Sequence, residues 1–143
     1  MLKVLGTVFL LMSIIVPDKF IVPVQSQQGG RDRWPWRKIV RVQNDLGNGV
    51  TLYVHCRSKD DDLGEHYLSN GQYQEWSFGI SWIGSTLFWC NVGWNDVKHS
   101  FEAYNNGRDY LLCGSQCWRS IKPDGAYFYL ERKGHRWVKQ YEW

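Results

Sequence analysis

Hydrophobic and polar residues alternate along this chain over short stretches, as they do in β-strands with one buried face. Residues 51–57 are the clearest case, because Leu52, Val54 and Cys56 fall on one face of an extended segment and the residues between them fall on the other. Six further stretches are rich in aromatic and β-branched residues: 38–43, 73–78, 86–90, 100–104, 126–130 and 136–141. We find no apolar period of 3.6 residues over ten or more positions, so we predict strands rather than helices.

Turn-forming residues separate these stretches. Asn48–Gly49 is a strong hairpin signal, and further clusters of glycine, asparagine, aspartate and serine stand at 69–71, 84–85, 105–107, 123–125 and 133–134. Such spacing is typical of antiparallel sandwiches and barrels. We therefore predict an all-β fold, a small antiparallel β-sandwich of about seven or eight strands over residues 38–143.

Aromatic residues add to this picture. Residues 86–90 are apolar on both faces, which predicts a central strand. The chain also contains nine tryptophans, which we interpret mostly as core residues because each buries a large area at low conformational cost.

The first 26 residues follow a different pattern. A basic start, Met1–Lys3, precedes the apolar run Val4–Val16, whose length fits the roughly 7–15 residues of a signal-peptide core better than the about 20 of a membrane span. The small residue Ser26 suits signal peptidase, so we expect a signal peptide over residues 1–26. The alternative, an uncleaved anchor, would place Asp18 and Lys19 inside the bilayer at high cost.

Secretion sets the context for the rest of the chain. Residues 27–37 are polar and contain glycine, so we expect a flexible leader ahead of the folded domain. Cleavage after Ser26 would leave 15 basic and 13 acidic residues, a net charge of +2. Nucleic-acid binders usually show a concentrated basic face, so we expect no nucleic-acid partner.

The four cysteines all follow the expected cleavage site. They are Cys56, Cys90, Cys113 and Cys117. An even number in a secreted domain predicts two disulfides. Because a Cys113–Cys117 bridge would close only a tiny loop, we expect each of these two to reach back to Cys56 or Cys90, in an order that the sequence leaves open. Zinc is the alternative, but a Cys-x₃-Cys pair matches no common ligand spacing, so we expect no metal.

The most distinctive segment is acidic. Asp60, Asp61 and Asp62 follow directly after the strand that ends near Cys56. Three adjacent carboxylates repel one another and are costly to bury, so they must lie on a solvated loop. Exposed loops on a rigid scaffold commonly carry binding, and we take Asp60–Leu63 as the candidate recognition loop. A solubilising turn and a calcium loop are the alternatives, although calcium loops space their ligands at alternate residues.

Catalytic arrangements are poorly supported. The chain has no Gly-x-Ser-x-Gly elbow. His55 and His99 would have to converge to serve a ribonuclease, and Asp60–Asp62 would have to pair with Glu65 or Glu75 to serve a glycosidase. Nothing local supports either arrangement, so we predict that the protein is not an enzyme and needs no cofactor.

The C-terminal stretch is basic and aromatic. In a regular strand Trp137, Lys139 and Tyr141 would share a face. That face could bind a glycan or an acidic membrane surface, or its aromatics could pack on the sandwich. A secreted defence protein that binds glycan or membrane is therefore the alternative function.

Taken together, these motifs resemble the plant self-incompatibility protein family, the stigmatic S-proteins and their homologues. The most specific piece is Cys56-Arg-Ser-Lys-Asp-Asp-Asp-Leu-Gly64, with Phe88-Trp-Cys90 further along. Val42-Gln-Asn44 and Asp124-Gly-Ala-Tyr127 also agree, and the resemblance extends from about Ile39 to Tyr141.

The resemblance implies a secreted β-sandwich with two disulfides and no enzymatic activity. Some members of that family are ligands that a membrane protein on incompatible pollen recognises. The four cysteines match the family's disulfide cysteines, and the positions that match the core are Trp76, Phe78, Phe88 and Trp89. We expect a monomer that binds a cell-surface receptor through four exposed loops: Asp60–Leu63, Gly79–Ser85, Asn91–Lys98 and Asn105–Asp109.

Overall fold

The computed structural model describes residues 36–81 and 83–143. The expected signal peptide and most of the expected leader lie outside these described residues and stay predictions. Within them the chain forms nine strands and one short helix: β1 (Arg37–Asn44), β2 (Leu52–Arg57), β3 (Asp62–Leu68), β4 (Tyr73–Gly79), β5 (Leu87–Trp94), β6 (Val97–Asn105), α1 (Asn106–Asp109), β7 (Gln116–Lys122), β8 (Gly125–Leu130) and β9 (Arg136–Glu142).

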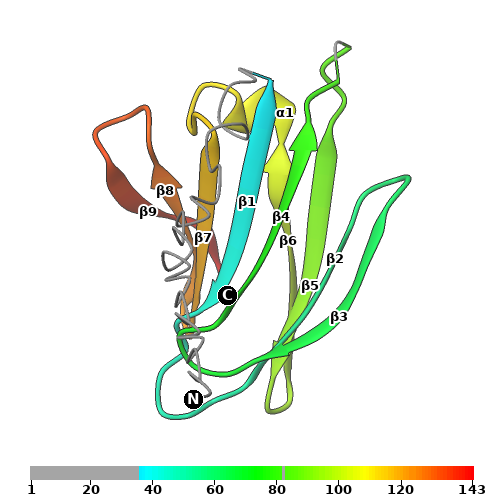
Figure 1. Cartoon of the computed structure of the whole chain (residues 1–143). Helices are drawn as coiled ribbons and strands as arrows, with labels where there is room; N and C mark the ends of the chain where they lie inside the picture. Colours follow the sequence, from blue (N-terminus) through cyan, green and yellow to red (C-terminus); the bar gives the residue numbers. More distant parts are fainter. Residues whose placement is uncertain (1–35, 82) are drawn as a thin grey trace, which may run out of the picture. The chain divides into compact units, whose positions relative to one another are not determined.

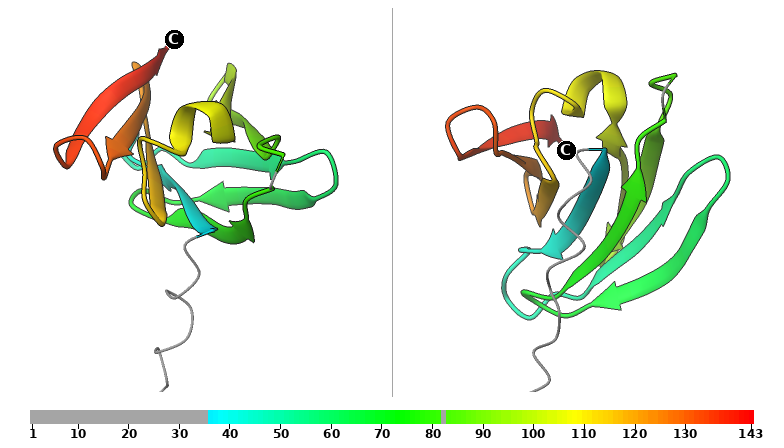
Figure 2. Two further views of the ribbon diagram at one scale, coloured as in Figure 1. Left: turned by 90° about the horizontal axis from the view of Figure 1, so that it is seen from above. Right: turned by 45° about the horizontal axis from the view of Figure 1, so that its top comes forward.

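The strands form two sheets that pack face to face (Figure 1). One sheet has five strands in the order β4-β1-β7-β8-β9, and the other has four in the order β3-β2-β5-β6. All neighbours are antiparallel except β1 and β7, which run parallel. The two views of Figure 2 show the helix α1 at one end of the layers. The predicted all-β sandwich is confirmed.

Alternation places the core between the sheets. In β2, Leu52, Val54 and Cys56 are fully buried, while the residues between them are only partly buried, as the pattern predicts. From the facing sheet, β1 contributes Val40 and Val42, which are also fully buried. The strand that begins at Leu87 lies between β2 and β6, so the prediction of a central strand is also confirmed.

The predicted number of strands was too low, because two strands carry misleading residues. β3 begins with the acidic Asp62 and contains Gly64, which has a φ of +77° and therefore a conformation that side chains rarely adopt. In β7 the inward-facing row Cys117, Arg119 and Ile121 is fully buried although its central member is charged. A hydrophobic pattern therefore detects neither strand.

The prediction that the tryptophans are mostly core residues is confirmed only in part: in the described residues, Trp76, Trp94 and Trp143 pack partly buried against the core. No described tryptophan belongs to the fully buried core. Phe88 is 4% exposed as expected, and Trp76 and Phe78 pack partly buried against the core. Trp89 lies opposite Arg57 in the register and faces away from the other sheet. Tryptophan suits such margins, where its N–H reaches a partner, as Trp143 does at 3.1 Å from the Lys122 carbonyl.

The disulfide pairing differs from our expectation. Cys56 bonds to Cys90, and Cys113 bonds to Cys117. The first pair lies directly opposite on the antiparallel neighbours β2 and β5. The second pair closes the short turn that leads into β7. Lys38 donates to the carbonyl oxygens of Cys113 and Gly114, so this small loop is also fixed from β1.

A buried ion pair joins the layers. The Arg119 guanidinium lies 3.2 Å from the Asp109 carboxylate, and both side chains are 1% exposed. Arg119 also donates to the Ala103 carbonyl at 2.8 Å and stacks on the Phe128 ring at 3.8 Å from its centroid. Burial lowers the pKa of Arg119 to about 10, and Asp109 opposes this shift, so the arginine stays charged at neutral pH.

We predict that the two disulfides contribute unequally to stability. Their cysteines are 34 and 4 residues apart, so the chain-entropy model assigns about 4 kcal/mol to Cys56–Cys90 and about 2 kcal/mol to Cys113–Cys117. Denaturant unfolding of the two double-alanine variants, each missing one bridge, measures the difference. Equal losses from both variants would contradict the prediction.

We also predict that Arg119→Met lowers the free energy of unfolding by about 3–5 kcal/mol, because it leaves Asp109 buried without this partner. The matched control is Arg41→Met, which breaks the half-exposed Arg41–Glu75 pair and should cost no more than about 1 kcal/mol. Urea unfolding of both variants tests this, and a loss from Arg119→Met as small as that of the control would contradict it.

Candidate functional site

Three of the four expected recognition loops meet at one end of the sandwich. Because β2 and β5 are antiparallel, the β2–β3 turn, the loop before β5 and the helix after β6 all lie at that end (Figure 1). We call it the α1 end. The fourth segment, Asn91–Lys98, is not a loop: it forms the ends of β5 and β6 at the opposite end, with only Asn95 and Asp96 in the turn.

The acidic segment forms the tip of the β2–β3 hairpin. Ser58 N–H donates to the Asp61 carbonyl at 2.8 Å, and Asp61 N–H donates to the Ser58 hydroxyl at 3.1 Å. This closed turn projects Asp60 and Asp61 into solvent. The predicted exposure of these two carboxylates is confirmed, and their role in binding stays a prediction.

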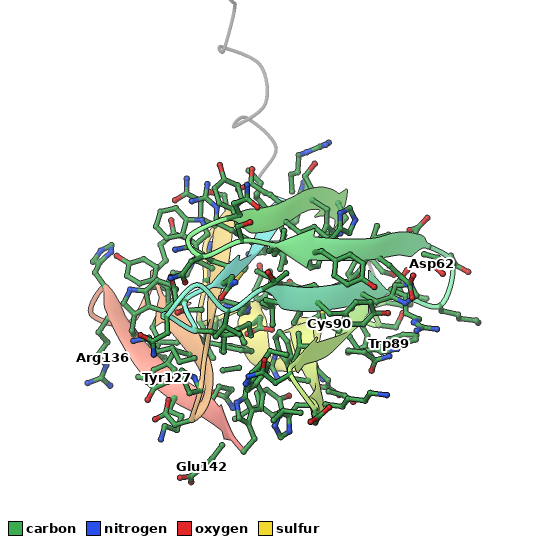
Figure 3. The ribbon with its side chains drawn as sticks, turned by 90° about the horizontal axis from the view of Figure 1, so that it is seen from below. Asp62, Trp89, Cys90, Tyr127, Arg136 and Glu142 are labelled. Carbon is green, nitrogen blue, oxygen red and sulfur yellow. A yellow bond between two sulfur atoms is a disulfide. The ribbon has the colours of Figure 1, made fainter. Side chains whose placement is uncertain are left out.

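Asp62 and Leu63 belong to β3 rather than to a loop. Figure 3 shows Asp62 on the opposite side of the molecule from Arg136. The Asp62 carboxylate accepts from Gly64 N–H at 2.9 Å and bonds His55 Nε2 at 2.6 Å. Both contacts lower the pKa of Asp62 below its ordinary value, and the hydrogen bond from Gly64 N–H has a larger effect than the one with His55. Leu63 packs partly buried against the core, so it is less available for recognition than its acidic neighbours.

Exposed apolar side chains gather at the α1 end. They are Trp36, Ile83, Tyr110 and Leu111, and Ile83 is 88% exposed. A small hollow of about 230 Å³ lies among them, lined by Trp36, Ile80, Ser81, Gly84, Asn106 and Tyr110. Sequence reasoning missed Tyr110 and Leu111, although an apolar pair directly after a turn and outside any alternating stretch was a usable signal.

The helix fixes the shape of this end. Asn105 caps α1 by accepting from Gly107 N–H at 3.0 Å, and Asn105 N–H donates to Asp109 at 2.8 Å. Asp109 points inward to the buried ion pair and is 1% exposed. The expectation that all of Asn105–Asp109 is an exposed recognition loop was therefore wrong at its last residue.

A groove lies on the outer face of the four-stranded sheet and extends toward the end opposite α1. We call it the outer groove; it is open, with a volume of about 1180 Å³. Its side chains stand in rows across the strands. One row, in the order β3-β2-β5-β6, is Tyr67, Tyr53, Gly93 and Lys98, and the next is Glu65, His55, Asn91 and Ser100. Sequence reasoning assigned Tyr53 and His55 to one face but could not place the partner strands.

The groove contains a network of polar contacts. The Tyr53 hydroxyl donates to Glu65 at 2.7 Å, and this bond raises the pKa of Tyr53 above its ordinary value. Arg57 Nη2 lies 3.3 Å from His55 Nδ1 and so joins the contact between His55 and Asp62. These bonds hold the polar side chains of β2 and β3 in fixed positions beside the groove.

The structure does not bring the considered catalytic groups together. His55 and His99 both line the outer groove, but His99 pairs with the inward-facing Val92 and its ring stacks on Trp143 at 4.7 Å, whereas His55 lies on the outer face. Glu75 pairs with Arg41 on the outer face of the five-stranded sheet, away from Glu65. In the part of the chain that the structure describes, no three metal-binding side chains cluster, and no helix is both long and apolar enough to cross a membrane.

The C-terminal strand departs from the expected regular pattern. Tyr127 pairs with Lys139 and Ala126 pairs with Tyr141, so Gln140 is an extra residue that forms a bulge. The bulge turns Tyr141 inward, where it contacts Phe101 and Phe128. Trp137 and Lys139 remain outside. The expectation that all three side chains share a face was therefore wrong.

Comparisons with known proteins agree with this architecture. Residues 39–143 match the model of the family described as plant self-incompatibility protein S1. The chain is 45% identical over 73 residues to S-protein homolog 2 of Arabidopsis thaliana, covering 51% of this chain and 45% of that protein. It is 38% identical over 90 residues to Self-incompatibility protein S1 of Papaver rhoeas, covering 62% and 65%. The matched part of the chain thus spans less than two thirds of the length of each of these two relatives.

A solved structure supports the fold. It is described as that of SPH (self-incompatibility protein homologue) proteins, a widespread family of small, highly stable, secreted proteins from plants. It matches with a TM-score of 0.55 and covers 75% of this chain and 96% of that chain, at 21% sequence identity. At this identity the likeness concerns the fold.

We predict that His55→Phe raises the pKa of Asp62 only part of the way to its ordinary value, because the Gly64 bond remains. The depressed pKa stabilises the folded state above the unfolded pKa of about 3.9, and this contribution is lost as pH falls through the folded value. NMR titration of the Asp62 carboxyl carbon, in the unchanged protein and in His55→Phe, measures the two pKa values. Glu65→Gln is the control and should leave the Asp62 titration unchanged, and a full return in His55→Phe would contradict the prediction.

Proposed function

The chain belongs to the plant self-incompatibility protein S1 family, and we propose that it is a secreted, non-enzymatic ligand for a cell-surface receptor. The observation that carries the proposal is the α1 end, where exposed apolar side chains lie on the same end of the sandwich as an acidic hairpin.

Secretion is supported by the cysteines and by the apolar run of the expected signal peptide. In the described residues all four cysteines are in disulfides, and no cysteine is free. Disulfides persist in oxidising compartments and are rare in the cytosol. The apolar run Val4–Val16 has the length of a signal-peptide core, which agrees with export.

Receptor binding is supported by the chemistry of the α1 end. Ile83 and Leu111 are 88% and 62% exposed at the end where Trp36 and Tyr110 are also exposed, and gathered exposed apolar residues mark interaction sites. Protein interfaces commonly combine an apolar centre with a polar rim, and rim charges steer association and select partners. We assign Ile83 and Leu111 to the centre and Asp60 and Asp61 to the rim.

Within this proposal, the partner surface is apolar with basic groups beside it. Lys59 is the only cation among the consecutive residues 59–62, so the hairpin tip carries a net negative charge. Opposite charge on the receptor would increase the association rate most strongly at low salt. The defence alternative has weaker support, because the bulge at Gln140 removes Tyr141 from the aromatic face on which it relied.

The test is binding of the purified, disulfide-bonded protein to plant-cell plasma membranes. We expect the double variant Asp60→Lys/Asp61→Lys and the double variant Ile83→Glu/Leu111→Glu each to weaken saturable binding by about tenfold or more, since loss of one interface anchor costs at least about 2 kcal/mol. Asp62 stays unchanged because its carboxylate holds the hairpin.

The matched control lies at the opposite end. Asp96→Lys/Tyr73→Glu changes an exposed acidic residue and an exposed aromatic residue, neither of which lines the outer groove. It should bind as the unchanged protein does. Equal weakening by the control, or saturable binding that ignores all α1-end changes, would overturn the assignment of this surface.

A further inference from the structure

We propose that the outer groove binds an uncharged oligosaccharide chain. The inference goes beyond the receptor-ligand proposal and does not depend on it, because it concerns the face of the four-stranded sheet rather than the α1 end. It is carried by the shape of the groove, by the two rows of side chains that line it, and by its balance of charge.

A glycine stands in the middle of the row that contains the two tyrosines. A Cβ atom at Gly93 would lie 3.1 Å from the Val97 carbonyl oxygen and 3.9 Å from both Tyr53 Cδ1 and Lys98 Cγ, so the absence of a side chain here lets Tyr53 and Lys98 approach each other over the buried glycine. The next ring in the row is Tyr67, at 5.5 Å from Tyr53, and it is 71% exposed. The exposed Tyr67 ring, beside Tyr53, therefore offers an apolar aromatic surface that suits the C–H-bearing face of a sugar ring.

The neighbouring row offers hydrogen-bonding groups. His55, Asn91 and Ser100 stand side by side across three strands. Within the described part of the chain, the side chains of Asn91 and Ser100 make no hydrogen bond. An amide both donates and accepts, as does a hydroxyl, and sugar hydroxyls require both. The two rows together place an apolar surface beside polar groups that have no partner within the described part of the protein, the usual composition of a ligand site.

Charge selects an uncharged ligand. The cations Arg57 and Lys98 line the groove together with the anion Glu65, and Asp62 lies at its edge in contact with His55. A polyanion would meet the two carboxylates and a polycation would meet the two cations. A neutral chain of hydroxyl-bearing units avoids both penalties and still accepts hydrogen bonds from the charged groups.

Size and form select a chain over a single small molecule. The groove volume of about 1180 Å³ exceeds the ~300–1,000 Å³ of ordinary small-molecule sites, and the groove is open. A peptide would usually add as a strand to a sheet edge, where backbone groups are free. The outer groove lies instead across the middle strands β2 and β5, whose backbones are already paired on both sides.

The other sheet shows the contrast. On its outer face Arg41 lies between the rings of Tyr73 and Trp118, at 4.0 and 5.0 Å from their centroids, and Trp118 stacks on Tyr129 at 5.6 Å. Each of these rings is therefore already in contact with a neighbouring side chain of the same sheet. That surface supplies matched control positions for the test.

The test uses affinity electrophoresis of the purified protein in gels that contain xyloglucan, arabinoxylan or galactomannan, with polygalacturonate as the charged comparison. We expect retardation by at least one neutral polysaccharide, insensitive to salt. Tyr67→Ala and Asn91→Ala should each weaken the apparent Kd by at least tenfold. Tyr73→Ala, which removes an exposed tyrosine from the other sheet, should leave it unchanged, and thermal unfolding verifies that all three variants are folded.

Several results would overturn the proposal. They are no retardation by any neutral polysaccharide, retardation by polygalacturonate alone that disappears in salt, or equal weakening by Tyr73→Ala. Binding of the protein to anionic lipid vesicles with the same sensitivity to Tyr67→Ala would assign the groove to membranes instead. The Asp60→Lys/Asp61→Lys variant should retain polysaccharide binding, so failure of the groove proposal and failure of the receptor proposal are distinguishable.

Discussion

The arrangement of both sheets depends on one buried ion pair, Arg119 with Asp109. Burying two charges is costly unless each has partners. Arg119 Nη2 makes no hydrogen bond, so the guanidinium depends on its ion pair with Asp109 and on its other contacts. Arg119 donates to the Ala103 carbonyl and stacks on Phe128, while Asp109 accepts from Asn105 N–H and from Arg108. The pair therefore links β7 of the five-stranded sheet to α1, which follows directly after β6 of the four-stranded sheet. A hydrophobic contact would not fix this geometry, because it lacks direction.

This constraint determines what the α1 end can display. Asp109 must point inward, so the short helix turns the next residues, Tyr110 and Leu111, toward solvent. Arg108 closes the same corner by donating to the Glu102 carbonyl and to the Tyr141 hydroxyl. The apolar character of the candidate receptor surface is thus a consequence of the way the core is bonded. A loop that was not held by this ion pair could fold inward and bury Tyr110 and Leu111.

Sequence reasoning succeeded where the pattern is local and failed where pairing is distant. The alternation of β2 and the exposure of Asp60 and Asp61 follow from neighbouring residues alone. The inward Arg119 conceals β7, because no local pattern marks a charge as satisfied by a residue in another segment. Pairing of Cys56 with Cys90 depends on β2 and β5 being neighbours, and the inward turn of Tyr141 depends on a single bulge. Each is a property of strand register, which the chain specifies only when it is folded.

The same register connects the core to the outer groove. Successive residues of a strand point to opposite faces, so fixing one face fixes the other. Cys56 and Cys90 form a covalent bond on the inner face between β2 and β5, and the outer residues Tyr53, His55, Asn91 and Gly93 project from these same two strands. The disulfide therefore prevents a shift of register that would move Gly93 from beside Tyr53. A ligand site held in this way loses little freedom on binding, and more of its contact energy is retained as affinity.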